Sequence, residues 1–157
     1  MRAVLRLLLA LLAVPAWGQG PMPTALAELD RAGRSIAAAR CARPVENKTS
    51  QVGGSRDEMQ SVDCRTFRVA LYVAHQGGTV RESPMALVVL GDGPALPRGL
   101  AVGSEPAAVQ ALLGPPTRQR GDSFSYLLDP SRPAGDSITF EVDAGRVRAI
   151  SWSWSVD

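Results

Sequence analysis

The chain has 157 residues, with 17 Lys and Arg against 15 Asp and Glu, which gives a formal net charge of +2. Two of the arginines lie in the first eighteen residues, and the remaining 139 residues carry 15 charges of each sign. A near-neutral chain lacks the basic excess that binding to nucleic acid or to an anionic membrane needs, and 139 residues suffice for one domain with a single core.

Residues 1–18 have the pattern of a secretory signal peptide, with two arginines, a short apolar run and small residues at Ala16 and Gly18. The apolar run is too short to span a membrane. We expect cleavage after Gly18, with cleavage after Ala16 as the alternative, and no cysteine at the junction to carry a lipid anchor. Because Lys48 is the only lysine beside sixteen arginines, the composition is typical of a GC-rich bacterial gene. The expected location is the periplasm or the exterior of a bacterium.

Residues 24–40 predict a first amphipathic helix that docks on a sheet. Thr24 is placed to cap the free amides at its start. The small or apolar residues that share one face of this helix are Leu26, Leu29, Gly33 and Ile36.

Residues 42–60 are polar and broken by proline and glycine, which predicts a surface loop. The only two cysteines, Cys41 and Cys64, lie near its ends. In an oxidising compartment we expect them to form a disulfide, which would stabilise the fold by about 3 to 4 kcal/mol. The alternative is a metal site, but two cysteines and His75 do not complete a tetrahedral set.

Alternating apolar residues over 62–75 predict a strand, with a bulge near Arg65 or Thr66 where the alternation changes parity. A turn at 76–79 and a second apolar strand over 85–90 make an antiparallel hairpin. Residues 91–98 are a linker.

Residues 99–116 predict a second, short helix. Ser104 is placed to cap it, and Glu105 lies at the positive end of the helix dipole. Gly114 suits the left-handed stop, and two prolines follow it. The buried stripe of this helix consists of Val109, Leu112 and Leu113.

Three strands follow, over residues 124–128, 138–142 and 146–156, with a tight turn at 143–145 between the last two. The expected fold is α+β: an antiparallel sheet of about five strands with two helices packed on one face. We expect residues 19–157 to form one domain, with a helix and hairpin in residues 24–90 and a helix and three strands in residues 99–157.

The second half resembles the BamE (SmpA/OmlA) family of envelope lipoproteins and the related fold of the β-lactamase inhibitor protein. The resemblance covers residues 99–154 and is carried by Gly99, Val102, Gly103, Val109, Leu112, Leu113, Gly114, Pro115, Tyr126, Phe140, Gly145, Val147 and Ile150. It implies an envelope protein that assembles with, or binds, other proteins. The chain departs from the family because no cysteine follows the signal. Whether residues 24–90 are a diverged second copy of the unit, as in the tandem inhibitor, stays open.

The sequence offers few candidates for catalysis. His75 is the only histidine, and no nucleophile or orienting acid is marked beside it. Glu141 and Asp143 share a strand face and are a possible glycosidase pair. The structural interpretation, solvated acids beside a tight turn, is the simpler one.

The residues most typical of a protein interface lie near the C-terminus. We expect a partner-binding set of Tyr126, Arg146, Arg148, Trp152 and Trp154. The alternative, favoured by parity with Ile150 and Val156, is that both tryptophans lie in the core under the helices. The rings form a binding platform only if the helices cover the other face.

These observations together predict a non-catalytic protein-binding module of the bacterial envelope, of the inhibitor or immunity type. The alternative is an assembly or maintenance factor of the outer membrane and envelope, and an enzyme is the third hypothesis. We expect no cofactor, no metal, no nucleic-acid partner and no integral membrane segment once the signal is removed. The expected partner is a protein in the periplasm or the exterior.

Overall fold

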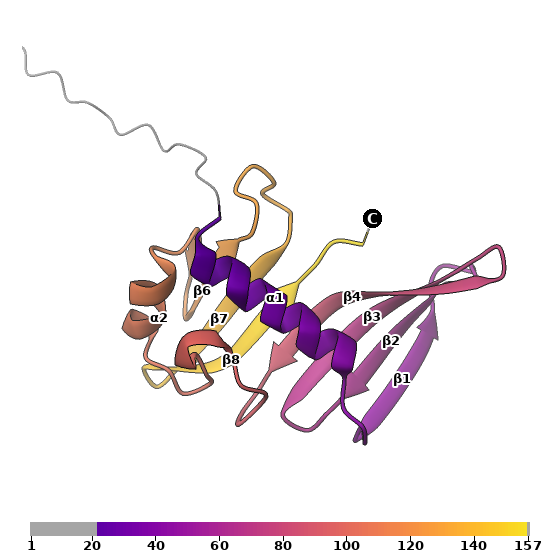
Figure 1. Ribbon diagram of the computed structural model, residues 1–157, viewed down its shortest axis with the longest axis horizontal. Coiled ribbons are helices and arrows are strands. Elements are labelled where there is room, and N and C mark those ends of the chain that lie inside the picture. The colour runs from indigo at the N-terminus through magenta and orange to yellow at the C-terminus, as the bar shows by residue number, and fades with distance from the viewer. Residues whose placement is uncertain (1–21, 157) are drawn as a thin grey trace, which may run out of the picture.

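The computed structural model describes residues 22–156, so the predicted signal peptide lies outside the described residues. It contains two α-helices, one short 3₁₀ helix and eight strands (Figure 1). In chain order these are α1 (Thr24–Ala39), β1 (Glu46–Gln51), β2 (Glu58–Asp63), β3 (Phe67–Gln76), β4 (Thr79–Val89), η1 (Pro97–Gly99), α2 (Pro106–Leu113), β5 (Arg118–Arg120), β6 (Ser123–Leu127), β7 (Ser137–Asp143) and β8 (Arg146–Ser153).

All eight strands belong to one antiparallel sheet with the order β1-β2-β3-β4-β8-β7-β6-β5. The sheet consists of two four-stranded meanders that meet where β4 pairs with β8, and we call this line the central junction. An α-helix precedes each meander in the chain, so the order of one helix and four strands occurs twice.

The expectation of about five strands with two helices packed on one face is wrong. The sheet has eight strands, and only α1 crosses the middle of its face, whereas the shorter α2 lies at one end, beside β6 (Figure 1). The β3–β4 turn and the strand expected over 138–142 agree with the sequence analysis in position. The strand expected over 146–156 ends earlier, at Ser153.

The missing strands come from polar sequence. Residues 42–60 were expected to be a loop, but they contain β1 and the start of β2. Every residue of β1 is exposed, so the strand has no buried face and its sequence has no apolar alternation. Pairing with the apolar strand β3 fixes β2, which in turn holds β1. The three exposed residues of β5 were missed for the same reason.

The parity change near Arg65 has a different cause from the expected bulge. The chain turns there between β2 and β3, with Arg65 at φ 69°. The Cys64 amide donates to the Phe67 carbonyl across this turn at 2.8 Å. The alternation changes because two strands meet at this point, not because one strand is bulged.

Neither predicted side-chain cap is present. Pro23 precedes α1 and Glu105 precedes α2, and neither helix start has a side-chain cap. The Ser104 hydroxyl instead accepts a hydrogen bond from the Ala101 amide at 3.1 Å. The stop signal of the second helix is confirmed, since Gly114 follows α2 with φ 85° and its amide donates to the Gln110 carbonyl.

The core lies between the sheet and α1 and continues to α2. Leu29 and Ala37 of α1 are fully buried, as are Val69 of β3 and Ile150 of β8. Because these residues come from both meanders, one core spans the central junction.

The disulfide between Cys41 and Cys64 is present, with a Cα–Cα distance of 5.8 Å. It links the segment after α1 to the β2–β3 turn and encloses β1 and β2. Such a bond fits an oxidising compartment outside the cytoplasm. Among residues 22–156, no helix has both the length and the apolar character to cross a membrane.

Candidate protein-binding face

The sheet has one face covered by helices and one face that the described residues leave uncovered. In β3 the buried residues Val69 and Leu71 point toward α1, and the alternate residues Ala70 and Tyr72 therefore point away from it. In Figure 1, α1 and η1 lie on the same side of the sheet. We call the opposite side the open face.

Strand register places small side chains across the middle of the open face. One row runs through paired positions of all eight strands: Glu46, Asp63, Arg68, Val88, Ser151, Thr139, Ser125 and Arg118. The adjacent row contains Ala70, Ala86, Ser153 and Ser137, and it ends at Leu127, which is 6 % exposed.

The central residues of these two rows are no larger than valine, and we call them the floor. The floor consists of Ala70, Ala86, Val88, Ser125, Ser137, Thr139, Ser151 and Ser153. All of its residues are partly or fully exposed, whereas the opposite side of the same strands is buried. Solvent therefore reaches a floor of small side chains in the middle of the open face.

Charged side chains surround the floor. Three ion pairs lie on the open face: Arg68 with Asp63 at 2.7 Å, Arg148 with Glu141 at 2.8 Å, and Lys48 with Glu46 at 2.9 Å. Pairing with the Arg68 guanidinium, together with the Arg65 amide, lowers the pKa of Asp63. The carboxylates of Asp63, Glu141 and Glu46 are therefore each neutralised by a basic neighbour.

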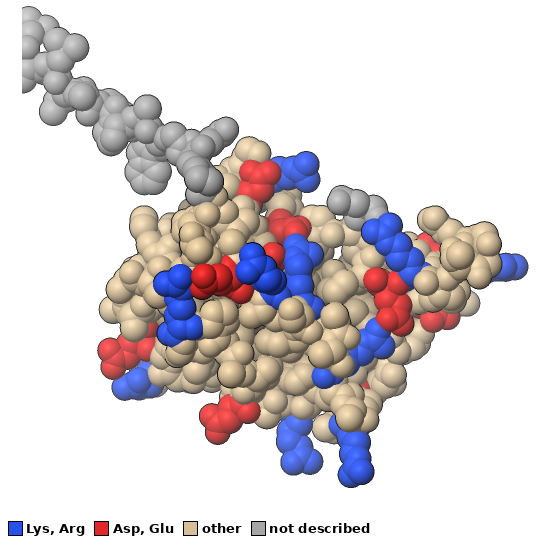
Figure 2. All heavy atoms as spheres, in the orientation of Figure 1, with Lys and Arg blue, Asp and Glu red and all other residues tan. Residues whose placement is uncertain are grey.

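Three further arginines on the open face have no acidic partner among the described residues: Arg81, Arg118 and Arg120. Arg118 donates instead to the Pro133 carbonyl. Asp122 and Asp143, which line a depression with Arg148, have no basic ion-pair partner among the described residues either, so unpaired groups of both signs lie on this face. The opposite side, seen in Figure 2, carries acidic and basic side chains interspersed over α1.

The structure places the three aromatic residues of the predicted partner-binding set in the core. Trp152 is 1 % exposed, Trp154 is 3 % exposed and Tyr126 is 2 % exposed. The helices lie over the face that these rings occupy, so the rings do not form an exposed platform. The alternative interpretation, in which both tryptophans lie under the helices, describes their position.

The two large rings have structural contacts that account for their burial. The Trp152 indole lies directly under Gly33 of α1. Trp154 donates its indole N–H to the Asp30 carboxylate at 2.8 Å, and the Arg34 guanidinium lies 5.1 Å above its ring. Arg34 also pairs with Asp136 at 2.8 Å. These contacts hold α1 against the segment that directly follows β8.

The Tyr126 hydroxyl donates to the Gly114 carbonyl at 2.9 Å. Its ring packs edge-on against Phe140, with centroids 6.0 Å apart. Burial raises the pKa of Tyr126 to about 12. Tyr126 therefore holds the end of α2 against β6.

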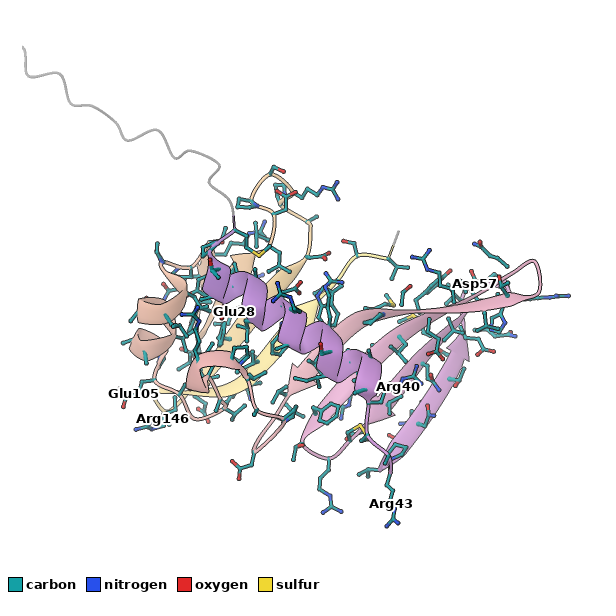
Figure 3. All side chains as sticks on the ribbon, viewed as in Figure 1. Glu28, Arg40, Arg43, Asp57, Glu105 and Arg146 are labelled. Atoms are coloured by element: carbon teal, nitrogen blue, oxygen red, sulfur yellow. A yellow bond between two sulfur atoms is a disulfide. The ribbon has the colours of Figure 1, made fainter. Side chains whose placement is uncertain are left out.

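The two arginines of the predicted set are both exposed, but they have different partners in different parts of the fold. Arg148 is on the open face, in its pair with Glu141. Arg146 donates to the Gly103 carbonyl at 3.0 Å and pairs with Glu105 at 3.3 Å, at the entry to α2 (Figure 3). Only Arg148 belongs to the open face.

The candidate catalytic residues are not brought together as one set. His75 is on β3 and on the α1 side of the sheet, because it has the parity of Val69 and Leu71. Glu141 lies on β7, on the open face. Glu141 and Asp143 do line one open depression of about 420 Å³, together with Arg148. The Glu141 carboxylate in it is already bound by Arg148.

Asp57 is a contact residue that the sequence analysis missed. It lies between β1 and β2 (Figure 3), where it accepts hydrogen bonds from the Tyr72 hydroxyl at 2.6 Å and from the His75 amide at 2.9 Å. The Tyr72 hydrogen bond, followed by the His75 amide, lowers the pKa of Asp57. These hydrogen bonds hold the β1–β2 hairpin against β3, so the role of the Asp57 carboxylate is structural.

Comparison with known proteins adds no identification: no family model, no curated protein and no solved structure matches the chain. The likeness to the BamE family and to the β-lactamase inhibitor protein remains a prediction.

Proposed function

We propose that this chain is a non-catalytic protein-binding module and that its partner docks on the open face. The observation that carries the proposal is the uncovered eight-stranded face with its floor of small side chains. In a sheet that served only as scaffold, the uncovered side would need no such feature. Long charged side chains of the kind seen at its rim would solvate it equally well.

The size of the open face suits a stable protein interface. Eight strands spaced about 4.8 Å apart span roughly 34 Å, and central strands of seven residues are roughly 23 Å long. The resulting area is about 800 Å², which is close to the contribution of each partner to an interface of standard size.

The chemistry of the floor also suits a protein partner. Alanine and serine let the backbone or large side chains of a partner approach the sheet closely, and they lose little side-chain entropy when they are covered. Backbone and hydroxyl groups between the apolar atoms offer hydrogen bonds. The charged rim supplies the outer, solvated part of an interface.

We further propose that the module acts in the bacterial periplasm or exterior, as an inhibitor or immunity-type protein. The Cys41–Cys64 disulfide supports an oxidising location. A rigid surface with a floor of small side chains suits a protein that blocks another by covering it. In this role the captured partner is an enzyme, and its turnover falls when the module binds.

The test is affinity capture from an envelope extract of the source organism, with four immobilised forms of residues 19–157. These are the unmodified chain, Ala86→Arg, Ser151→Arg and Ser35→Arg. The first two substitutions place a long side chain on the floor, whereas Ser35 is exposed on α1 and serves as the control. Circular dichroism of each form would establish that it is folded before the capture is compared.

The unmodified chain and the Ser35→Arg control should retain one protein at equal stoichiometry, and the two floor variants should lose it. Retention of no protein, or equal retention by the floor variants, contradicts the proposal. Retention of an outer-membrane assembly component would support binding at this face but would replace the inhibitor role by the envelope-assembly hypothesis.

A further inference from the structure

Half of β4 has a neighbour on only one side. Residues 79–84 pair with β3, whereas β8 pairs only with residues 86–89 of the same strand. Within residues 22–156, the other side of residues 79–84 is therefore a free strand edge. It lies in the interior of the strand order, where β4 extends past the end of β8 (Figure 1).

The free edge exists because the C-terminal segment turns away from β4. The Trp154 amide makes the last contact, a hydrogen bond to the Met85 carbonyl at 2.7 Å. The next amide, of Ser155, donates to the Asp136 carboxylate at 2.8 Å, and the Trp154 indole N–H donates to Asp30. These acids hold Trp154 and Ser155 toward α1 and the β6–β7 connection, and among the described residues no pairing between the C-terminal segment and β4 continues beyond Met85.

Hairpin geometry identifies the backbone groups on this edge. Gly77 and Gly78 form a two-residue turn with both φ values positive, and Gln76 faces Thr79 across it. In such a turn the closing pair exchanges hydrogen bonds, and the next pair does not. The amide and carbonyl groups of Val80 and Glu82 therefore point away from β3, along the free edge.

A cavity of about 660 Å³ lies beside this edge. Tyr72, Arg81 and Ser83 line it from the hairpin, and Trp154, Ser155 and Val156 line it from the segment that follows β8. The lining combines apolar atoms with polar groups. It can therefore receive side chains of a strand placed against β4.

The side chains along the edge indicate what the added strand would carry. Arg81 faces the cavity and has no acidic partner among the described residues. Glu82, on the other side of the strand, is already paired with Arg40. Val80 is 61 % exposed. An acidic residue opposite Arg81 and an apolar residue opposite Val80 would satisfy both positions.

We infer that the free edge of β4 is a binding site for an extended, acidic peptide segment. The segment would add to the sheet as a strand beside residues 79–84, beyond the end of β8. The segment pairs its backbone with Val80 and Glu82 and places a carboxylate against Arg81. This site is at the edge of β4, and it does not require that the floor of the open face binds a folded partner.

The probe is a random dodecapeptide library displayed on phage and selected against residues 19–157, followed by synthetic labelled copies of the selected peptides. Val80→Pro is the diagnostic variant, because it removes an amide that points away from β3 and leaves the β3–β4 ladder intact. Val80→Thr is the matched control, since threonine is β-branched and keeps the amide. Arg81→Glu reverses the charge at the site.

The selected peptides should be enriched in Asp and Glu. Their affinity should fall at least tenfold for Val80→Pro and for Arg81→Glu, and should change less than threefold for Val80→Thr. In the unmodified protein, the Val80 and Glu82 amides should gain hydrogen-exchange protection on peptide binding, a result that does not depend on the folding of any variant.

Peptides that bind Val80→Pro as well as the unmodified protein, or that leave both amides unprotected, would overturn the inference. Concentration-dependent dimers that Val80→Pro abolishes would also overturn it, because a second copy would then be the occupant. Ala86→Arg separates the two proposals, since it alters the floor and leaves the Val80 edge unchanged. If Ala86→Arg loses the captured protein but still binds the peptides, the result would support both the docking of a partner on the floor and the peptide site at the edge of β4.

Discussion

Gly33 shows how one missing side chain decides the position of α1. A Cβ atom at this position would lie 2.6 Å from Nε1 of Trp152 and 2.7 Å from its Cε2. The indole is fully buried and cannot move without disturbing β8. Glycine is therefore required by the close approach of the helix to the sheet, and not by backbone conformation.

Gly33→Ala should lower the free energy of unfolding by about 1 to 3 kcal/mol, because the added methyl group overpacks the core. Helix propensity alone gives the opposite sign, a gain of about 1 kcal/mol. Urea denaturation followed by tryptophan fluorescence measures the difference. Ser35→Ala, on the exposed side of the same helix, should change stability by less than about 0.5 kcal/mol. A stabilised Gly33→Ala would show that α1 does not rest on Trp152.

Tyr126 contributes to the alkaline side of the stability profile, together with Tyr72, whose pKa is raised by its hydrogen bond to Asp57. The pKa of Tyr126 rises from the ordinary value of 10.0 to about 12 in the folded chain because the phenol is buried. Between these values the unfolded chain loses the proton and the folded chain keeps it, so stability is full below pH 10 and falls as pH rises toward 12. Tyr126→Phe should lose this part of the decline when urea unfolding is measured from pH 8 to 11.5. An unchanged slope would contradict the assignment.

At the scale of single residues, the sequence predicts which side chains are buried better than it predicts which residues they contact. The parity of Trp152 and Trp154 with Ile150 indicates the core, and both rings are there. The sequence does not show that Asp30 and Asp136, which are 106 positions apart, meet the Trp154–Ser155 segment. Those contacts depend on where α1 crosses the sheet, which local spacing does not encode.

Among the elements, the β1–β2 hairpin is the part most dependent on its covalent link. All of β1 is exposed, and Val62 is the only fully buried residue of β2. The hairpin therefore contributes little apolar burial of its own, and the disulfide holds the turn that follows it. Predicting it from sequence needs the long-range pairing with β3, whereas α1 and β3 are evident from their own periodicity.

The double variant Cys41→Ser, Cys64→Ser should lower the free energy of unfolding by about 3 kcal/mol. Hydrogen exchange in residues 46–63 should become faster first, because this segment lies inside the closed loop, while β7 and β8 remain protected under native conditions. Mass spectrometry of exchanging peptides measures this order. Equal loss of protection in β1 and β8 would mean that the disulfide supports the whole sheet and not its outer hairpin.

For the molecule as a whole, the repeated order of one helix and four strands does not give two independent units. The core continues across the central junction, and α1 of the first half covers Trp152 of the second. Neither half alone buries that ring. The sequence predicts the elements of the second half more fully, but the eight-stranded sheet depends on the β4–β8 pairing between residues about 65 positions apart.

Fragments 22–92 and 96–156 should each lack a cooperative unfolding transition. Both tryptophans of the described chain lie in the second fragment, so its emission should shift to shorter wavelength when the first fragment is added. A first fragment shortened to residues 41–92, which lacks α1, should not produce the shift. A cooperative transition of fragment 96–156 alone would show that the second half folds without α1.

The crossing of α1 over the central junction has a consequence for how the protein meets other molecules. Sixteen helical residues, about 24 Å in length, contact β4 and β8 at once and prevent the two meanders from hinging about the line between them. The sheet therefore has the same twist in the free protein as in a complex with a partner. Association at the uncovered side would proceed as docking of rigid bodies, with backbones in the free and bound states superimposing to within about 1 Å.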